Sequence, residues 1–173
     1  VRGDQAEDPY GTVIGKRAFF RAVSDLDTVV FDDEADLGAA ILGCPNTGEN
    51  DGLTVIISDF FTDSDWKKAV DYLLYRKRQV FLIQMLTPDE VEPLYQGRVN
   101  LIDSESADLL DAKNMKMKIN RAAQAAYDEA LRDIIGDIRQ FCASRDVGFV
   151  SVRTDQPIEK TLFMELLKVG IMA

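Results

Sequence analysis

The chain has 173 residues, of which 46% are hydrophobic and 29% charged, and it contains no histidine. The absence of imidazole excludes Ser-His-Asp and Cys-His catalytic pairs, a histidine general base and histidine metal ligands. Thirty acidic and twenty basic residues give a formal charge of -10, which argues against nucleic acid as a partner because phosphate binding needs clustered lysine and arginine. The length predicts one domain with a substantial core.

The cysteine pattern and the hydropathy pattern indicate the compartment. Cys44 and Cys142 fit neither a metal spacing nor a disulfide framework, which favours a reducing compartment such as the cytoplasm. No stretch approaches the roughly 18 apolar residues of a membrane span, and no signal peptide is present. The chain begins at Val1, which indicates a fragment. We therefore expect no membrane insertion by this segment, with any membrane association supplied by parts outside this chain.

The first third of the chain predicts a boundary segment followed by two helices. Residues 1–15 are rich in Gly, Asp and Pro and are expected to be a linker, with a short strand at 12–14. Apolar residues at helical spacing predict an amphipathic helix from Lys16 to about Asp27. A shorter helical pattern follows at 37–41, after an acidic turn, and 44–52 reads as a loop.

Two apolar runs predict strands buried on both faces of a parallel sheet, at 53–57 and 79–86. Between them, Thr62 and Asp65 fit a capping box that starts a helix. After the second run, Thr87 and Glu90 fit another, for a short helix that Pro93 ends.

The remaining elements complete an alternating pattern. Runs at 98–103 and 114–119 predict an antiparallel hairpin on the edge of the sheet. Asn120 is placed to cap the longest helix, 148–152 predicts the last buried strand, and 154–157 opens a closing helix. This order predicts an α/β fold with a mainly parallel, three-layer sheet and an antiparallel hairpin insertion.

Candidate binding residues follow the strands, because parallel sheets bind ligands beyond their carboxyl ends. Three pairs lie there: Ser58 and Asp59, Gln84 and Thr87, Thr154 and Asp155. For Thr87 and Thr154, a structural role in starting a helix or closing a turn is favoured over a ligand-binding role by roughly four to one. For Ser58 and Asp59 the two readings are about even, because capping falls to Thr62 and leaves Asp59 without a structural task.

Asp59 and Ser58 would offer oxygen ligands to Mg2+, and Asp36 would add a neighbouring oxygen. An acid in a first helical turn is more often a dipole partner, and the acidic run 32–36 does not have the spacing of an EF-hand loop. No glycine-rich phosphate loop is present.

Several short motifs occur in a characteristic order: an "ISD" strand end at 57–59, "VxxxxxxxPxE" at 80–90, "LxDxE" at 101–105, Tyr127, and "TDxP" at 154–157. Residues 35–41 are similar to a "TDLxxAI" segment. Over about residues 16–170 the combination resembles a bacterial von Willebrand factor A-like family of unknown function, whose genes neighbour MoxR-type AAA ATPases.

The resemblance implies a Rossmann-like sheet carrying a metal-ion-dependent adhesion site, with ligands from a D-x-S-x-S motif, a threonine and an aspartate. Asp59 corresponds to that aspartate, Ala35 stands at the threonine position, and D-x-S-x-S is absent. Either residues 16–173 are the C-terminal part of the domain, with its first strand upstream of Val1, or the site has decayed. We expect no cofactor, or weak Mg2+ binding if the full-length domain completes the site.

These observations favour a non-enzymatic interaction domain, a scaffold or adaptor in an ATPase-linked or membrane-linked complex, with a MoxR-type AAA ATPase as partner. The alternative is a Mg2+-dependent, carboxylate-based hydrolase centred on Asp59. In the related fold the missing first strand pairs with the strand at 54–58. We therefore expect residues 1–15 or a second copy of the chain, as a homodimer, to cover that edge.

Overall fold

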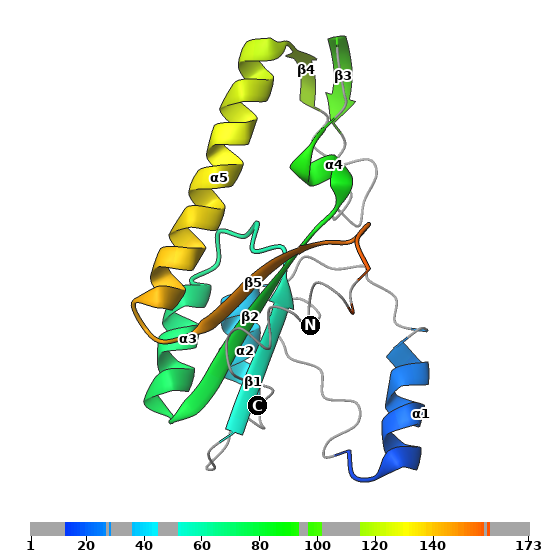
Figure 1. Cartoon of the computed structure of the whole chain (residues 1–173), viewed down its shortest axis with the longest axis vertical. Coiled ribbons are helices and arrows are strands. Elements are labelled where there is room, and N and C mark those ends of the chain that lie inside the picture. The colour runs from blue at the N-terminus through cyan, green and yellow to red at the C-terminus, as the bar shows by residue number, and fades with distance from the viewer. Residues whose placement is uncertain are drawn as a thin grey trace. The chain divides into compact units, whose positions relative to one another are not determined.

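A computed structural model describes residues 13–26, 28, 36–44, 52–93, 97–101, 115–157 and 159 (Figure 1). The elements in chain order are α1 (Lys16–Leu26), α2 (Leu37–Gly43), β1 (Gly52–Ser58), α3 (Trp66–Tyr75), β2 (Arg78–Leu86), α4 (Pro88–Val91), β3 (Gly97–Leu101), β4 (Met115–Ile119), α5 (Arg121–Ala143) and β5 (Gly148–Arg153). The structure is therefore mixed α/β, as the alternating pattern predicts.

The chain divides into two compact units. The first comprises Val1–Glu49, Thr62–Tyr72 and Ile102–Lys113, and the second comprises Asn50–Phe61, Leu73–Leu101 and Asn114–Ala173. α1 and α2 belong to the first unit, and every strand belongs to the second. The two units are interleaved along the chain.

In the first unit, α2 packs closely against the residues that precede α3. The Gly38 backbone N–H donates to Ser64 Oγ at 3.3 Å. A Cβ atom at Gly38 would lie 3.1 Å from the backbone carbon of Asp65, so a larger residue here would have to displace that backbone by a few tenths of an ångström. Asp36 caps α2, its Oδ1 accepting the Ala39 N–H at 2.8 Å.

The second unit contains a parallel sheet with strand order β1-β2-β5. β2 lies in the centre, where Phe81 and Leu82 are fully buried. Phe81 and Ile83 form a core cluster with Val150 and Val152 of β5. Burial on both faces is confirmed for β2, whose continuous apolar run matches a central strand.

Burial on both faces is wrong for β1. Leu53, Val55 and Ile57, which alternate along the strand, are 42%, 46% and 63% exposed, whereas Ile56 on the opposite face is buried. Among the described residues β1 pairs with β2 alone, so it is an edge strand of the described sheet. An edge strand lacks the flanking side chains that cover a central one, and apolar composition does not distinguish the two cases.

The hairpin prediction is correct for the pairing and wrong for the location. β3 and β4 pair antiparallel, from Gly97 opposite Ile119 to Leu101 opposite Met115. They form a two-stranded sheet of their own rather than an edge of the parallel sheet. In Figure 1 they lie beside the start of α5, because α4 carries the chain beyond the carboxyl end of β2.

Helix α3 begins later than the predicted capping box. It starts at Trp66, and Asp65 caps it: Asp65 Oδ1 accepts the Lys68 N–H at 3.4 Å. Thr62 Oγ1 instead accepts the Ser64 N–H at 3.1 Å, closing a turn before the helix. The predicted caps Thr87 and Asn120 are confirmed.

Helix α5 buries a stripe formed by Leu131, Ile138, Phe141 and Cys142. Tyr127 and Ile134, which helical spacing places near the same stripe, are each 38% exposed. Among the described residues no helix has the length and apolar character needed to cross a bilayer.

Some predictions fall outside the described residues. These are the closing helix beyond residue 159, the linker at 1–12, the acidic turn at 32–35, and most of the loop at 44–52. Residues 13 and 14 are described and do not form a strand.

Candidate functional site

A polar row crosses the parallel sheet near its carboxyl end. The register pairs Ser58 of β1 with Gln84 of β2, and Gln84 with Ser151 of β5. Side chains at paired positions of neighbouring strands project from the same face of a sheet. Three polar side chains from distant parts of the sequence therefore share one face, at the end where ligands bind in parallel sheets.

Gln84 is the fully buried member of this row and the only polar residue among the buried residues described. Its Nε2 donates to the Asp59 carbonyl oxygen at 3.0 Å. Its Oε1 has no hydrogen-bond partner in the part of the chain that the structure describes. Because buried polar atoms are usually paired, Gln84 is an exceptional residue in the buried, otherwise apolar part of β2.

Asp59 and Ser58 organise the turn that follows β1. Asp59 Oδ1 accepts the Phe61 N–H at 2.9 Å, and Ser58 Oγ accepts the Phe60 N–H at 3.0 Å. Phe60 has a φ of 60° and is buried, a conformation that a bulky residue adopts only when its surroundings impose it. The expectation that Asp59 has no structural task is therefore wrong, because its carboxylate closes an Asx-turn.

A Mg2+ ion near Asp59 would need several oxygen ligands in octahedral geometry. No group of three or more cysteine, aspartate or glutamate side chains in the described part of the chain is placed to hold a metal ion. The Ser58 and Asp59 oxygens also accept backbone N–H groups. Asp36 caps α2 and belongs to the other compact unit. The described residues alone therefore do not supply a set of carboxylate or thiolate ligands for the ion. Ser58, Asp59 and Asp36 remain ligands predicted from the sequence.

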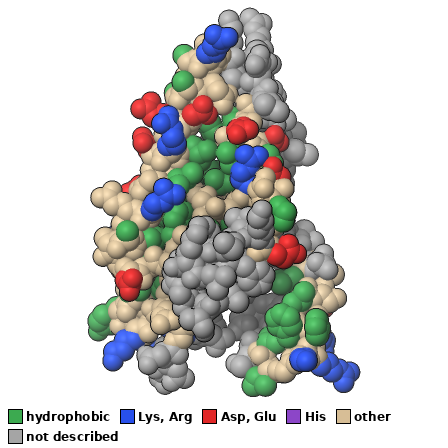
Figure 2. Space-filling view, viewed as in Figure 1, with side chains coloured by type: hydrophobic (Ala, Val, Ile, Leu, Met, Phe, Trp, Pro, Cys, Tyr) green, Lys and Arg blue, Asp and Glu red, His purple; other side chains and the backbone are tan. Residues whose placement is uncertain are grey.

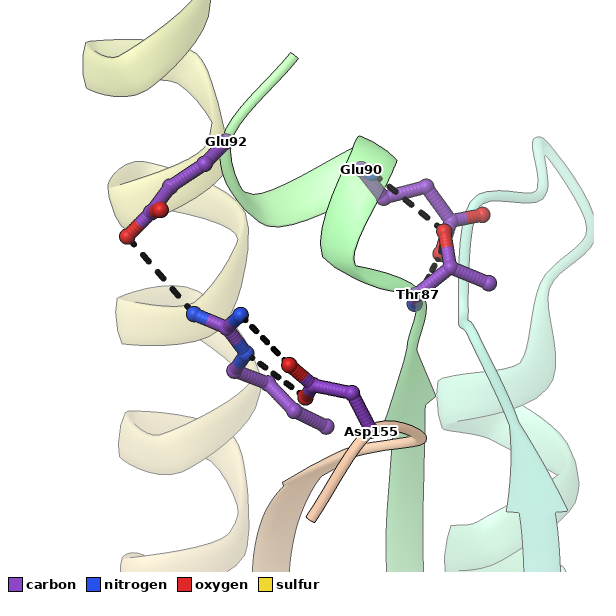
Figure 3. Close-up of polar contacts among 5 residues, drawn as sticks. Thr87, Glu90, Glu92 and Asp155 are labelled. Atoms are coloured by element: carbon purple, nitrogen blue, oxygen red, sulfur yellow. Dashed lines mark hydrogen bonds and ion pairs between the residues drawn. The ribbon is translucent and has the colours of Figure 1, made fainter. Parts of the chain in front are cut away.

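Thr87 and Glu90, after β2, form a reciprocal capping box on α4 (Figure 3). Glu90 Oε2 accepts from the Thr87 backbone N–H at 2.6 Å and from its hydroxyl at 2.9 Å. The Glu90 N–H in turn donates to Thr87 Oγ1 at 3.3 Å. The structural role favoured for Thr87 is confirmed.

After β5, Arg153 bridges two carboxylates from different segments. Its Nε and Nη2 donate to the two carboxylate oxygens of Asp155 at 3.1 and 2.9 Å, and its Nη1 lies 3.6 Å from Glu92 Oε1 (Figure 3). Hydrogen bonding from Arg153 lowers the pKa of Asp155 below its usual value. The Thr154 N–H donates to the Leu86 carbonyl at 2.9 Å, which continues the pairing of β5 with β2.

Tyr127 connects α5 to α4. Its hydroxyl donates to the Glu90 carbonyl oxygen at 2.6 Å. Burial raises the pKa of Tyr127, and the negative charges of Glu90 and Asp128 raise it further. The hydroxyl therefore stays protonated and able to donate at neutral pH.

Two residues of this region escaped sequence reasoning. Ser151 lies inside the last strand and reaches the polar row only through the register with Gln84. Arg153 ends that strand, and its position two residues before Asp155 is a signal that the sequence alone offers.

A protein-family model matches most of the chain. The family model described as "Protein of unknown function DUF58" matches residues 2–133. The chain belongs to the DUF58 family. The matched span of this DUF58 chain includes Ser58, Asp59, Gln84 and the capping box, while Ser151 and Arg153 follow it. Neither a curated protein nor a solved structure matches this DUF58 chain.

Proposed function

We propose that this DUF58 chain is a non-enzymatic protein-interaction domain, a scaffold or adaptor, whose binding surface is β1. The observation that carries the proposal is the open apolar face of this strand. Leu53, Val55 and Ile57 alternate along it and are 42–63% exposed. Contiguous apolar surface of this kind is characteristic of interaction sites.

The register shows that the exposure begins at β1. Val55 pairs with Phe81 and Ile57 pairs with Ile83, so these side chains lie on one face of the sheet. Phe81 and Ile83 are 0% and 7% exposed, whereas their partners on β1 are 46% and 63% exposed. The side chains that cover Phe81 and Ile83 on this face therefore leave Val55 and Ile57 exposed. Full burial of one Val or Ile side chain by a partner would contribute about 1.5–3 kcal/mol of hydrophobic free energy.

The backbone of β1 supports the same function. Among the described residues its hydrogen-bonding edge away from β2 has no partner strand. An exposed strand edge binds extended segments of other chains, with backbone hydrogen bonds for affinity and alternate side chains for specificity.

The fold family and the identity of the partner are also proposals. A parallel sheet with residues Ser58 and Asp59 at its carboxyl end is compatible with a Rossmann-like, von Willebrand factor A-like domain. The motif resemblance supports that assignment and suggests a MoxR-type AAA ATPase as partner. A second copy of the chain, paired through β1, is the other protein partner that this edge suits.

Sedimentation velocity tests the proposal, on the chain alone over a range of concentrations and on its mixture with a purified MoxR-type AAA ATPase. We expect association in at least one setting, lost in the double variant Val55→Lys/Ile57→Lys because charges on the strand face oppose its burial. Ile134→Lys, at a position of α5 that is 38% exposed, is the control and should leave association intact. Absence of association, or equal loss in both variants, would refute β1 as the binding surface.

Thermal unfolding with and without MgCl2 tests the alternative function, a Mg2+-dependent hydrolase centred on Asp59. A ligand that binds the native state raises Tm. We expect no shift, because Ser58 Oγ and Asp59 Oδ1 already accept backbone N–H groups of the turn. An upward shift that Asp59→Ala abolishes would instead favour the hydrolase.

A further inference from the structure

Helix α1 exposes an apolar face that no other element of the described structure buries. No residue of α1 is buried, and Phe19, Phe20, Val23 and Leu26 are 56%, 66%, 45% and 59% exposed. Their spacing puts them on one side of the helix. Figure 2 shows hydrophobic side chains gathered over the part of the molecule where Figure 1 places α1, with basic side chains beside them.

The charges of α1 are opposite in sign to those of the whole chain. Lys16, Arg17 and Arg21 outnumber the single acid Asp25, whereas the chain as a whole carries -10. Lys16 and Arg17 lie in the first turn, where the helix dipole disfavours cations. Only Arg21 has an ion-pair geometry within the helix, 3.9 Å from Asp25. Lys16 and Arg17 therefore do not serve the stability of the helix, and the excess of cations suits an anionic surface.

We propose that α1 lies flat on an anionic lipid surface, with its phenylalanines in the interface and its cations among the lipid phosphates. Its 11 residues are too few to span a bilayer. A strongly amphipathic helix with basic residues on its polar face and Phe and Leu on the other is the pattern of interfacial helices. Lys16, on the apolar side, reaches the headgroups through its flexible stem.

A lipid surface suits this helix better than a protein groove. A hydrophobic groove on a protein contacts helix residues at positions i, i+4 and i+7, which here are Phe19, Val23 and Leu26. Phe20 lies about 100° round the helix from Phe19 and widens the apolar face beyond that row of three. The two phenylalanine rings are 5.7 Å apart and both exposed, so a planar interface accepts both.

Co-sedimentation of the full chain with phosphatidylcholine vesicles, with and without about 30 mol% phosphatidylserine, tests the proposal. We expect binding to the anionic vesicles and little to the neutral ones. The binding should weaken when salt shortens the Debye length to a few ångströms. Phe19→Ser/Phe20→Ser should lower the partition coefficient at least about tenfold, since two apolar side chains leave the interface.

The matched control is Tyr75→Ser, which removes an aromatic ring that is 83% exposed on α3 and should leave binding unchanged. Thermal unfolding of the Phe19→Ser/Phe20→Ser variant distinguishes lipid binding by this face from packing of the face within the protein. Its Tm should equal that of the parent chain. No binding to anionic vesicles at low salt, equal loss in Tyr75→Ser, or a Tm lowered by several degrees would overturn the proposal, the last by assigning this face to packing within the protein.

Discussion

At the scale of single residues, Gln84 links the core of the sheet to the turn that carries Asp59. Its side chain is fully buried, and its Nε2 reaches the Asp59 carbonyl across a sequence separation of 25 residues. A buried amide is retained at a cost when one of its atoms lacks a partner. Gln84 therefore positions the Ser58–Asp59 turn rather than merely filling space.

We predict that Gln84→Ala lowers the free energy of unfolding by about 2–4 kcal/mol, because it leaves a cavity and an unpaired carbonyl. Gln79→Ala is the control: the same substitution in the same strand, at an exposed position, should change stability by less than about 0.5 kcal/mol. Urea unfolding measures both. Similar losses for the two variants would show that Gln84 has no special role.

A second prediction concerns the carboxylate of Asp155. Arg153 lowers its pKa in the folded protein, so this pair stabilises the fold above the ordinary aspartate pKa, and the contribution is lost as pH falls through the lowered value. In Arg153→Gln the pKa of Asp155 should rise toward 3.8, as measured by NMR titration. Arg153→Lys, which keeps the charge without the two parallel hydrogen bonds, should give an intermediate value. An unchanged pKa in Arg153→Gln would contradict the assignment.

At the scale of elements, short-range signals determine where helices begin. Asn120 Oδ1 accepts the Ala123 N–H at 2.9 Å and starts α5, as its place before a long periodic segment predicts. The start of α3 shows the limit of this reasoning. Thr62 and Asp65 are both capping residues, and the choice between them depends on the turn that Thr62 makes with Ser64.

For α5 we predict that Asn120→Ala lowers the free energy of unfolding by about 1 kcal/mol, through loss of the capping acceptor. Asn120→Asp keeps an acceptor oxygen beside the helix N-terminus and should retain the parent stability within about 0.5 kcal/mol. Thermal or urea unfolding measures the difference. A loss of the same size in both variants would mean that the acceptor oxygen is not the source of the stabilisation.

At the scale of the whole molecule, the open face of β1 and the acidic charge act on association in different ways. The exposed Val55 and Ile57 side chains favour contact with another chain, whereas a net charge of -10 keeps copies of the chain apart. Association through β1 should therefore strengthen as salt screens the repulsion, whereas binding of α1 to anionic lipid should weaken. The two proposals thus have opposite salt dependence.

The sequence by itself determined the identity of most elements, because periodicity, β-branched runs and capping residues act over a few neighbouring positions. The β2 run, the Thr87 and Glu90 capping box and the Asn120 cap were all predictable in this way. The tertiary structure alone decided that Val55 and Ile57 are exposed, that Gln84 meets the Asp59 carbonyl, and that the hairpin forms its own sheet. These features depend on which strands become neighbours, and an apolar run reads the same in the centre of a sheet and at its edge.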